Sequence, residues 1–90
     1  MVSKDSAIKA LHAVRQGVEG LQHYLSRLQK TPAYTTYDIQ KAREGLIRGD
    51  AIIAVLTPHL PESSKGVLEE VNKIQGENWS SYSKLGCNLD

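Results

Sequence analysis

The sequence predicts an all-α protein, either a three-helix up-down-up bundle or a helical hairpin, assembled as a homo-oligomer. Apolar residues recur at alternating steps of three and four over most of the chain, which is the period of a helix and not of a strand. The three prolines fall at the edges of these periodic segments and not inside them. Ninety residues suit a single domain, which we place over residues 1–90.

The first helix is predicted over residues 4–30. Ser3 or Asp5 can cap its start, and Pro32 ends it because the residue before a proline is disfavoured in the helical conformation. An a/d seam that continues over three heptads is typical of a helix packed along its length against other helices. This seam consists of Ala7, Leu11, Val14, Val18, Leu21, Leu25 and Leu28.

The second helix is predicted over residues 35–57, where Thr35 and Asp38 have the spacing of a capping box. The run Ala51–Leu56 is apolar on nearly every side of the helix, and this predicts burial on all sides at that end. Pro58 and Pro61 close the helix. Its seam consists of Ile39, Ala42, Leu46, Gly49, Ile53 and Leu56.

The third helix is predicted over residues 61–85, with Pro61 as its first residue and Gly86 as its C-terminal stop. Residues 87–90 are expected to fray. Asn78 interrupts the seam in the manner of a buried polar residue that fixes register. Because the connections are short, neighbouring helices should run antiparallel. The seam consists of Val67, Val71, Ile74, Asn78, Ser81 and Leu85.

Self-association is predicted from the small size of the core. The chain has no Phe and one Trp, and a protein this small buries only about 60–65% of its unfolded surface. The unbroken seam of residues 7–28 and the apolar run Ala51–Leu56 offer further burial between chains. A monomeric three-helix bundle is the alternative.

Composition and spacing argue against several classes of function. His12 and His23 share a helix face but lie about 16 Å apart along it, too far for one metal ion. No phosphate-binding loop or nucleophile elbow occurs, so we predict no enzyme, metal or cofactor. The net charge of +1 argues against nucleic acid as a partner. The longest apolar run is six residues and no export signal precedes it, which predicts a cytoplasmic protein of a bacterial or host cell without a membrane segment.

The candidate site is a pair of polar stripes in the basic half of the chain. Residues 1–48 hold eight basic and four acidic residues, whereas residues 49–90 hold three and six. Each stripe has a glycine near its middle, and a mid-helix glycine costs about 1 kcal/mol relative to alanine. One stripe consists of His12, Gln16, Gly20, His23, Arg27 and Lys30, the other of Tyr37, Lys41, Gly45 and Arg48.

Two interpretations of these stripes remain open. In the first, Gly20 and Gly45 allow another backbone or a ligand to approach closely, and an anion is surrounded by Tyr37, Lys41, Arg48 and Arg27, with the Tyr37 ring stacked on it. In the second, the stripes are the solvated backs of two amphipathic helices, and the glycines allow helix–helix contact. We predict that Gly17, Gly20 and Gly49 serve close helix crossing. The predicted ligand-binding residues are Tyr37, Lys41, Gly45, Arg48, Arg27 and His23.

Residues 34–85 carry a tyrosine and an arginine early in a helix, a Pro-x-Ser turn and an Asn-Trp pair: Tyr37, Arg43, Pro61-Glu62-Ser63 and Asn78-Trp79. This segment resembles the helical hairpin of phage anti-CBASS sponges, small proteins that counter cyclic-oligonucleotide bacterial immunity by sequestering the signal. The family's hairpin ends near its aromatic residue and asparagine and is closed by a run of small residues, which Ser80-Ser81-Tyr82-Ser83 replaces here. The resemblance implies a helical oligomer that binds cyclic nucleotides without catalysis.

The predicted function is therefore sequestration of a small anionic ligand, such as a cyclic nucleotide immune signal, by a non-enzymatic helical protein. The alternative is a protein–protein adaptor or inhibitor that acts through an aliphatic helix face. Ionic strength separates the two, because salt weakens anion binding more than apolar docking.

Overall fold

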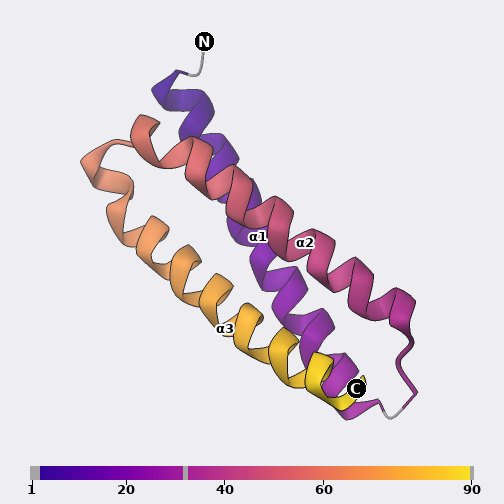
Figure 1. The fold of residues 1–90 in the computed structure, drawn as a ribbon. Helices are drawn as coiled ribbons and strands as arrows, with labels where there is room; N and C mark the ends of the chain where they lie inside the picture. The colour runs from indigo at the N-terminus through magenta and orange to yellow at the C-terminus, as the bar shows by residue number, and fades with distance from the viewer. Residues whose placement is uncertain (1–2, 32, 90) are drawn as a thin grey trace.

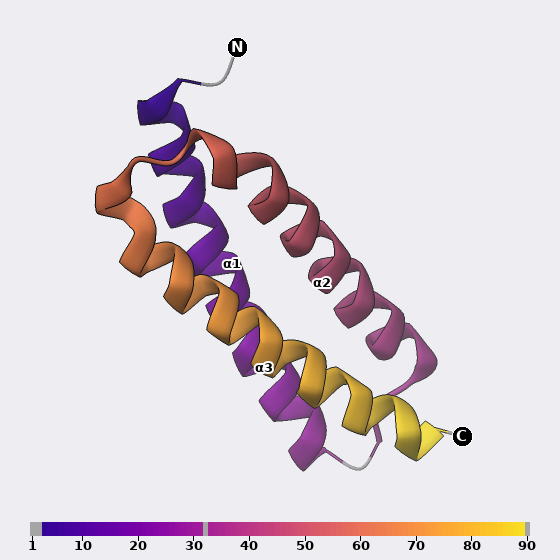
Figure 2. The ribbon, with the colours of Figure 1, turned by 60° about the vertical axis from the view of Figure 1, so that its left-hand side comes forward.

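The protein is a three-helix bundle in the computed structural model, which describes residues 3–31 and 33–89 (Figure 1). Helix α1 spans Lys4–Lys30, α2 spans Thr36–Leu56 and α3 spans Lys65–Leu89. Two single 3-10 turns, Thr57–His59 and Glu62–Ser64, join α2 to α3. Neighbouring helices run antiparallel, so α1 and α3 point the same way (Figures 1 and 2). The described part of the chain is all-α, as predicted.

The starts of α1 and α2 follow the local capping chemistry predicted from the sequence. The Ser3 hydroxyl accepts a hydrogen bond from the Ser6 backbone N–H at 3.1 Å, and this caps α1. Thr35 and Asp38 form the predicted capping box at the start of α2. At the end of α1, the Thr31 backbone N–H donates to the Leu28 carbonyl at 3.2 Å. Pro32 lies outside the described residues, so its predicted part in this stop is not tested.

Helix α3 differs from its prediction at both ends. Pro61 precedes a 3-10 turn and not the α-helix itself, which starts at Lys65. Gly86 does not stop the helix, which continues to Leu89 and so includes residues predicted to fray. Glycine ends a helix most often through a left-handed conformation, and no described glycine has a positive φ.

The core forms two aliphatic clusters stacked along the bundle. One lies at the end where α1 starts and α2 ends, and the other at the opposite end. All but two of the predicted seam positions of α1 and α2 are buried, the exceptions being the half-buried Leu21 and Gly49. The first cluster contains Ala7, Leu11, Val14, Val18, Ile53, Leu56 and Val71, and the second Leu25, Leu28, Ile39, Ala42 and Leu85.

Buried polar side chains from α3 lie near the middle of the bundle. The Gln75 Nε2 donates to the Leu46 carbonyl and to Asp50 Oδ1, both at 2.8 Å. The Asn78 Nδ2 donates to the Val18 carbonyl at 3.0 Å, and Asn78 is 1% exposed. Asn78 is therefore the buried polar residue that its seam position predicted. These bonds join α3 to both other helices and disfavour slippage of its register.

Gly49 serves the close helix contact predicted for it. A Cβ at this position would lie 3.0 Å from Gln75 Nε2, tighter than ordinary van der Waals contact. The glycine thus makes room for the buried amide that links α2 to α3.

The prediction that Ala51–Leu56 is buried on all sides is wrong for the single chain. Only Ile53 and Leu56 of this run are buried, whereas Val55 is 60% exposed. The physical reason is that α2 contacts α1 and α3 on one side only, so the opposite side of its last turns has no neighbour within the described chain.

A groove between helices one and two

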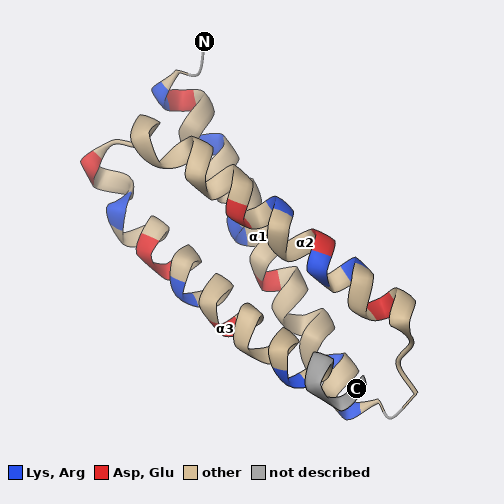
Figure 3. Cartoon of the chain, viewed as in Figure 1, with Lys and Arg blue, Asp and Glu red and all other residues tan. Residues whose placement is uncertain are grey.

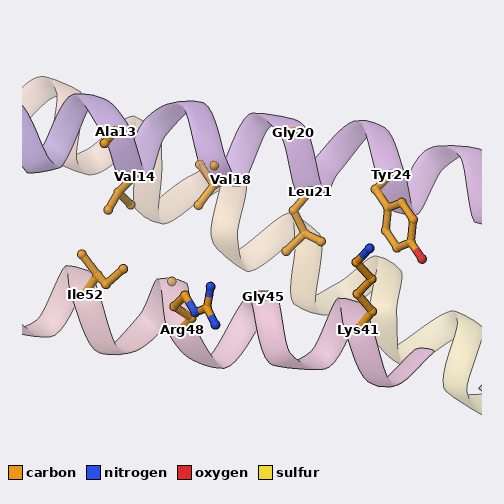
Figure 4. Close-up of a pocket in the computed structure, with 12 residues that line it drawn as sticks. Ala13, Val14, Val18, Gly20, Leu21, Tyr24, Lys41, Gly45, Arg48 and Ile52 are labelled. Atoms are coloured by element: carbon orange, nitrogen blue, oxygen red, sulfur yellow. The ribbon is translucent and has the colours of Figure 1, made fainter. Parts of the chain in front are cut away.

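An open groove of about 470 Å³ runs between α1 and α2 (Figure 4). Each wall is one helix face, with residues at steps of four, three and four, so the groove follows the two antiparallel axes. Its floor is aliphatic apart from one glycine. The walls are Ala13, Gly17, Gly20 and Tyr24 on α1 and Lys41, Gly45, Arg48 and Ile52 on α2, and the floor contains Val14, Val18, Leu21 and Gly49.

Missing side chains at the glycines give the groove its width. A Cβ added at Gly17 or Gly20 would meet no atom within 4 Å, and one at Gly45 would only touch the Leu21 side chain at 3.6 Å. The prediction that Gly17 and Gly20 serve close helix crossing within the chain is therefore wrong. Each costs helix stability relative to alanine, yet neither is needed by a neighbouring helix of the described chain.

Two cations lie on the α2 wall. Lys41 and Arg48 are seven residues apart, about 10 Å along the helix axis. Figure 4 shows both side chains in the space between the two helices. Neither forms an ion pair within 4 Å with a carboxylate among the described residues. The groove thus combines an apolar floor with two positive groups on one wall.

Tyr24 closes the end of the groove nearest Lys41. The Tyr24 hydroxyl donates to Asp38 Oδ1 at 3.1 Å, and this hydrogen bond joins the Tyr24 side chain of α1 to the start of α2. Burial raises the pKa of the Tyr24 hydroxyl, and the hydrogen bond to the Asp38 carboxylate raises it further. The hydrogen bond to Asp38 holds the Tyr24 ring in place as the end wall of the groove.

The Asp38 carboxylate accepts the hydrogen bonds that join Tyr24 of α1 to the start of α2. The Thr35 backbone N–H donates to it at 2.9 Å and is the largest cause of a pKa below the ordinary value for aspartate. The hydroxyls of Thr35 and Tyr24 and the nearby charge of Lys41 lower that pKa further, while partial burial opposes them.

We expect the Asp38 carboxylate to make stability pH-dependent. A carboxyl whose pKa is lower in the folded state stabilises the fold above its unfolded pKa of about 3.9, and this contribution is lost as the pH falls through the folded value. Asp38→Asn should therefore lower the free energy of unfolding at pH 7, and its deficit relative to the wild type should shrink below about pH 4. Urea denaturation at pH 7 and pH 3 measures this, with Glu69→Gln, exposed on α3, as control. A deficit of equal size at both pH values would contradict the assignment.

The structure brings together half of the predicted ligand-binding residues. Lys41, Gly45 and Arg48 line the groove, whereas His23, Arg27 and Tyr37 do not. The structure thus gives no support to His23, Arg27 and Tyr37 as groove residues. The physical reason is the orientation of α1 about its own axis. The face of α1 that carries the basic stripe is turned away from α2, and of the stripe residues only Gly20 lines the groove. Arg27 and Tyr37 still lie near enough to Tyr24 to affect its pKa.

The α1 wall was not predicted apart from Gly20. Its signal was present, since Ala13, Gly17, Gly20 and Tyr24 repeat at helical steps in the same way as the basic stripe. Small residues at such steps fit solvent exposure equally well, so only the facing helix identifies them as a groove wall.

Comparison of the chain with protein-family models, with curated proteins and with solved structures finds no match. The resemblance to the sponge family therefore stays a prediction. Two of its matching residues have structural contacts here, since Asn78 bonds to Val18 and the Trp79 Nε1 donates to Asp50 Oδ2 at 2.9 Å. In the family's hairpin the helix ends near these residues, whereas here α3 continues for ten residues past Trp79.

The described residues contain no grouping of three His, Cys, Asp or Glu side chains that could hold a metal ion. None of the helices, as far as they are described, has the length and apolarity to cross a membrane.

Proposed function

We propose that this chain is a non-enzymatic binding protein that sequesters a small anionic ligand in the groove between α1 and α2. One observation supports the proposal: three residues predicted from their spacing on one helix face, Lys41, Gly45 and Arg48, line a single groove together with an apolar floor. Small-molecule sites typically combine an apolar lining with a few polar groups that set orientation.

The groove favours a ligand with a flat or apolar body and separated anionic groups. Arg48 and Lys41 would each donate charge-assisted hydrogen bonds to a phosphate or carboxylate oxygen. Their spacing of about 10 Å suits two anionic groups better than one. A cyclic di- or trinucleotide has this form, with its bases against the glycines and the Tyr24 ring. Such an immune signal is the ligand we propose.

Arg48→Ala is expected to weaken binding about ten- to hundredfold without loss of helix. The estimate follows from the roughly 1.5–3 kcal/mol of a hydrogen bond to a charged group. Titration calorimetry of about 100 μM protein with a panel of cyclic di- and trinucleotides measures it. The matched control is Lys73→Ala, an exposed lysine of α3 outside the groove. Absence of heat with every nucleotide, or equal affinity of wild type and Arg48→Ala, would contradict the proposal.

The alternative function, an adaptor or inhibitor, is favoured by a separate observation. Ile47 and Val55 are 51% and 60% exposed on α2 and do not line the groove. A partner docked there would bind through apolar contact. Binding that persists from 50 mM to 500 mM salt would support this alternative over an anion site.

A further inference from the structure

The exposed apolar side chains of this protein gather on α2. Among the described residues, all four large hydrophobic side chains that are exposed belong to this helix: Tyr37, Ile47, Ile52 and Val55. Ile52 lines the groove, and Tyr37 lies at the start of the helix. Ile47 and Val55 share a helix face with the exposed Ala51 and Ala54. We name these four residues, Ile47, Ala51, Ala54 and Val55, the outer stripe.

The outer stripe has the form of a self-complementary surface. Ile47, Ala51 and Val55 follow one another at equal steps of four residues, so that a small side chain lies between two large ones. When two copies of α2 pack antiparallel with Ala51 at the twofold axis, Ile47 of each copy meets Val55 of the other. The small Ala51 allows the two helix axes to approach to about 8 Å. Such a twofold contact is isologous and closes at two copies.

The half of this contact around Ala51 and Val55 is free of charged residues, whereas the half around Ile47 has charged neighbours. The run Ala51–Leu56 is without Lys, Arg, Asp or Glu, and Figure 3 shows it as an uncharged end of the helix. Glu44, three residues before Ile47, and Arg48 are exposed beside the contact, whereas Asp50 is engaged by Trp79 and Gln75 of α3.

The surface area of the chain exceeds that of an average monomer of its mass. The chain exposes 6060 Å², whereas a monomeric globular protein of 9.9 kDa exposes about 5200 Å². An elongated bundle exposes more surface than a compact protein of equal mass, and the excess of roughly 900 Å² leaves room for a standard interface of ~800 Å² per partner. The extents of 43 × 22 × 16 Å describe a rod whose long side can supply such an area.

We propose that the outer stripe is the interface of an antiparallel α2–α2 homodimer. Because none of its residues lines the groove, the proposal stands independently of ligand binding. The partner is a second copy of this chain, and a different protein on the same face would leave the purified chain monomeric.

Sedimentation equilibrium of the purified chain between 5 and 100 μM tests the proposal. The wild type is expected at twice its 9.9 kDa mass. Ala51→Glu should shift it to the monomer mass, since two carboxylates would meet at the axis in an apolar contact. Ser80→Glu, the same charge on an exposed position of α3, should leave the dimer intact. A monomeric wild type at 100 μM, or an Ala51→Glu variant as dimeric as the wild type, would overturn the proposal.

A cross-link tests the geometry even if Ala51→Glu fails to fold. In a background with Cys87 replaced by Ser, Ala51→Cys should form a disulfide-linked dimer on mild oxidation, because facing Cα atoms at such an axis come within about 7 Å. Ser80→Cys should stay at least tenfold less cross-linked under the same conditions. Equal cross-linking at both positions, or none at position 51, would overturn the antiparallel arrangement.

Discussion

Leu25→Asp is expected to unfold the protein, whereas Leu21→Asp, one turn earlier in the same seam, should leave it folded. Leu25 is 1% exposed in the cluster with Leu28 and Ile39, so a carboxylate there would have no water and no partner. Burying an unpaired charge costs several kcal/mol or more. A chain of this size has a total stability of about 5–13 kcal/mol. The loss at Leu25 therefore removes most or all of it.

Leu21 differs because it is half-buried at the groove floor and open to solvent. A carboxylate there can stay hydrated, and it faces the wall that carries Lys41 and Arg48. We expect Leu21→Asp to keep its helical circular dichroism at 25 °C and to lose anion binding by competition. Leu21→Asn, which has a side chain of the same size as aspartate without the charge, is the control for the electrostatic contribution to the loss of anion binding. Equal unfolding by Leu21→Asp and Leu25→Asp would contradict the difference in burial.

Gly20→Leu is expected to change stability and binding in opposite directions. The Cβ at this position has open space around it, so a leucine side chain can enter the groove without displacing the core. Replacing a mid-helix glycine by leucine should raise the free energy of unfolding by about 0.5–1 kcal/mol. The same side chain occupies the groove volume, so affinity for an anionic ligand should fall at least a hundredfold.

Gly76→Leu is the matched control for this variant. Gly76 lies in α3, is exposed, and also has no atom within 4 Å of an added Cβ, but it does not line the groove. It should gain similar stability and keep wild-type affinity. Thermal unfolding and calorimetry on the same samples separate the two effects. If Gly20→Leu bound the ligand as tightly as Gly76→Leu, the groove would not be the binding site.

The apolar period and the capping residues were sufficient to predict the three helices. The start of α1 at Lys4 agrees with prediction because Ser3 supplies a cap that depends only on residues within one turn. Its end at Lys30 also agrees with the predicted range. The buried seams of α1 and α2 likewise follow from a repeat of three and four. Even Asn78 was identified, since a polar residue in an aliphatic seam stands out against its neighbours.

The site could be predicted only in part. Lys41, Gly45 and Arg48 share one face of one helix, and a single-helix pattern is sufficient to group them. Whether that face meets Gly20 or His23 of α1 depends on how the two helices rotate about their axes. That rotation is set by packing over the whole length of the bundle, which no local pattern records.

The sequence by itself determined that three helices form, the caps at the starts of α1 and α2, and the faces of these two helices that become the core, because each depends on residues within two or three turns. Only the tertiary structure decided which glycines allow a close helix contact and which border the groove. Gly49 lies against Gln75 of α3, whereas Gly17 and Gly20 border open space between α1 and α2. Asp50 accepts hydrogen bonds from Gln75 and from Trp79, which lie 25 and 29 residues further along the chain. Contacts at such separations exist only once the helices have packed, so they are properties of the bundle and not of any segment.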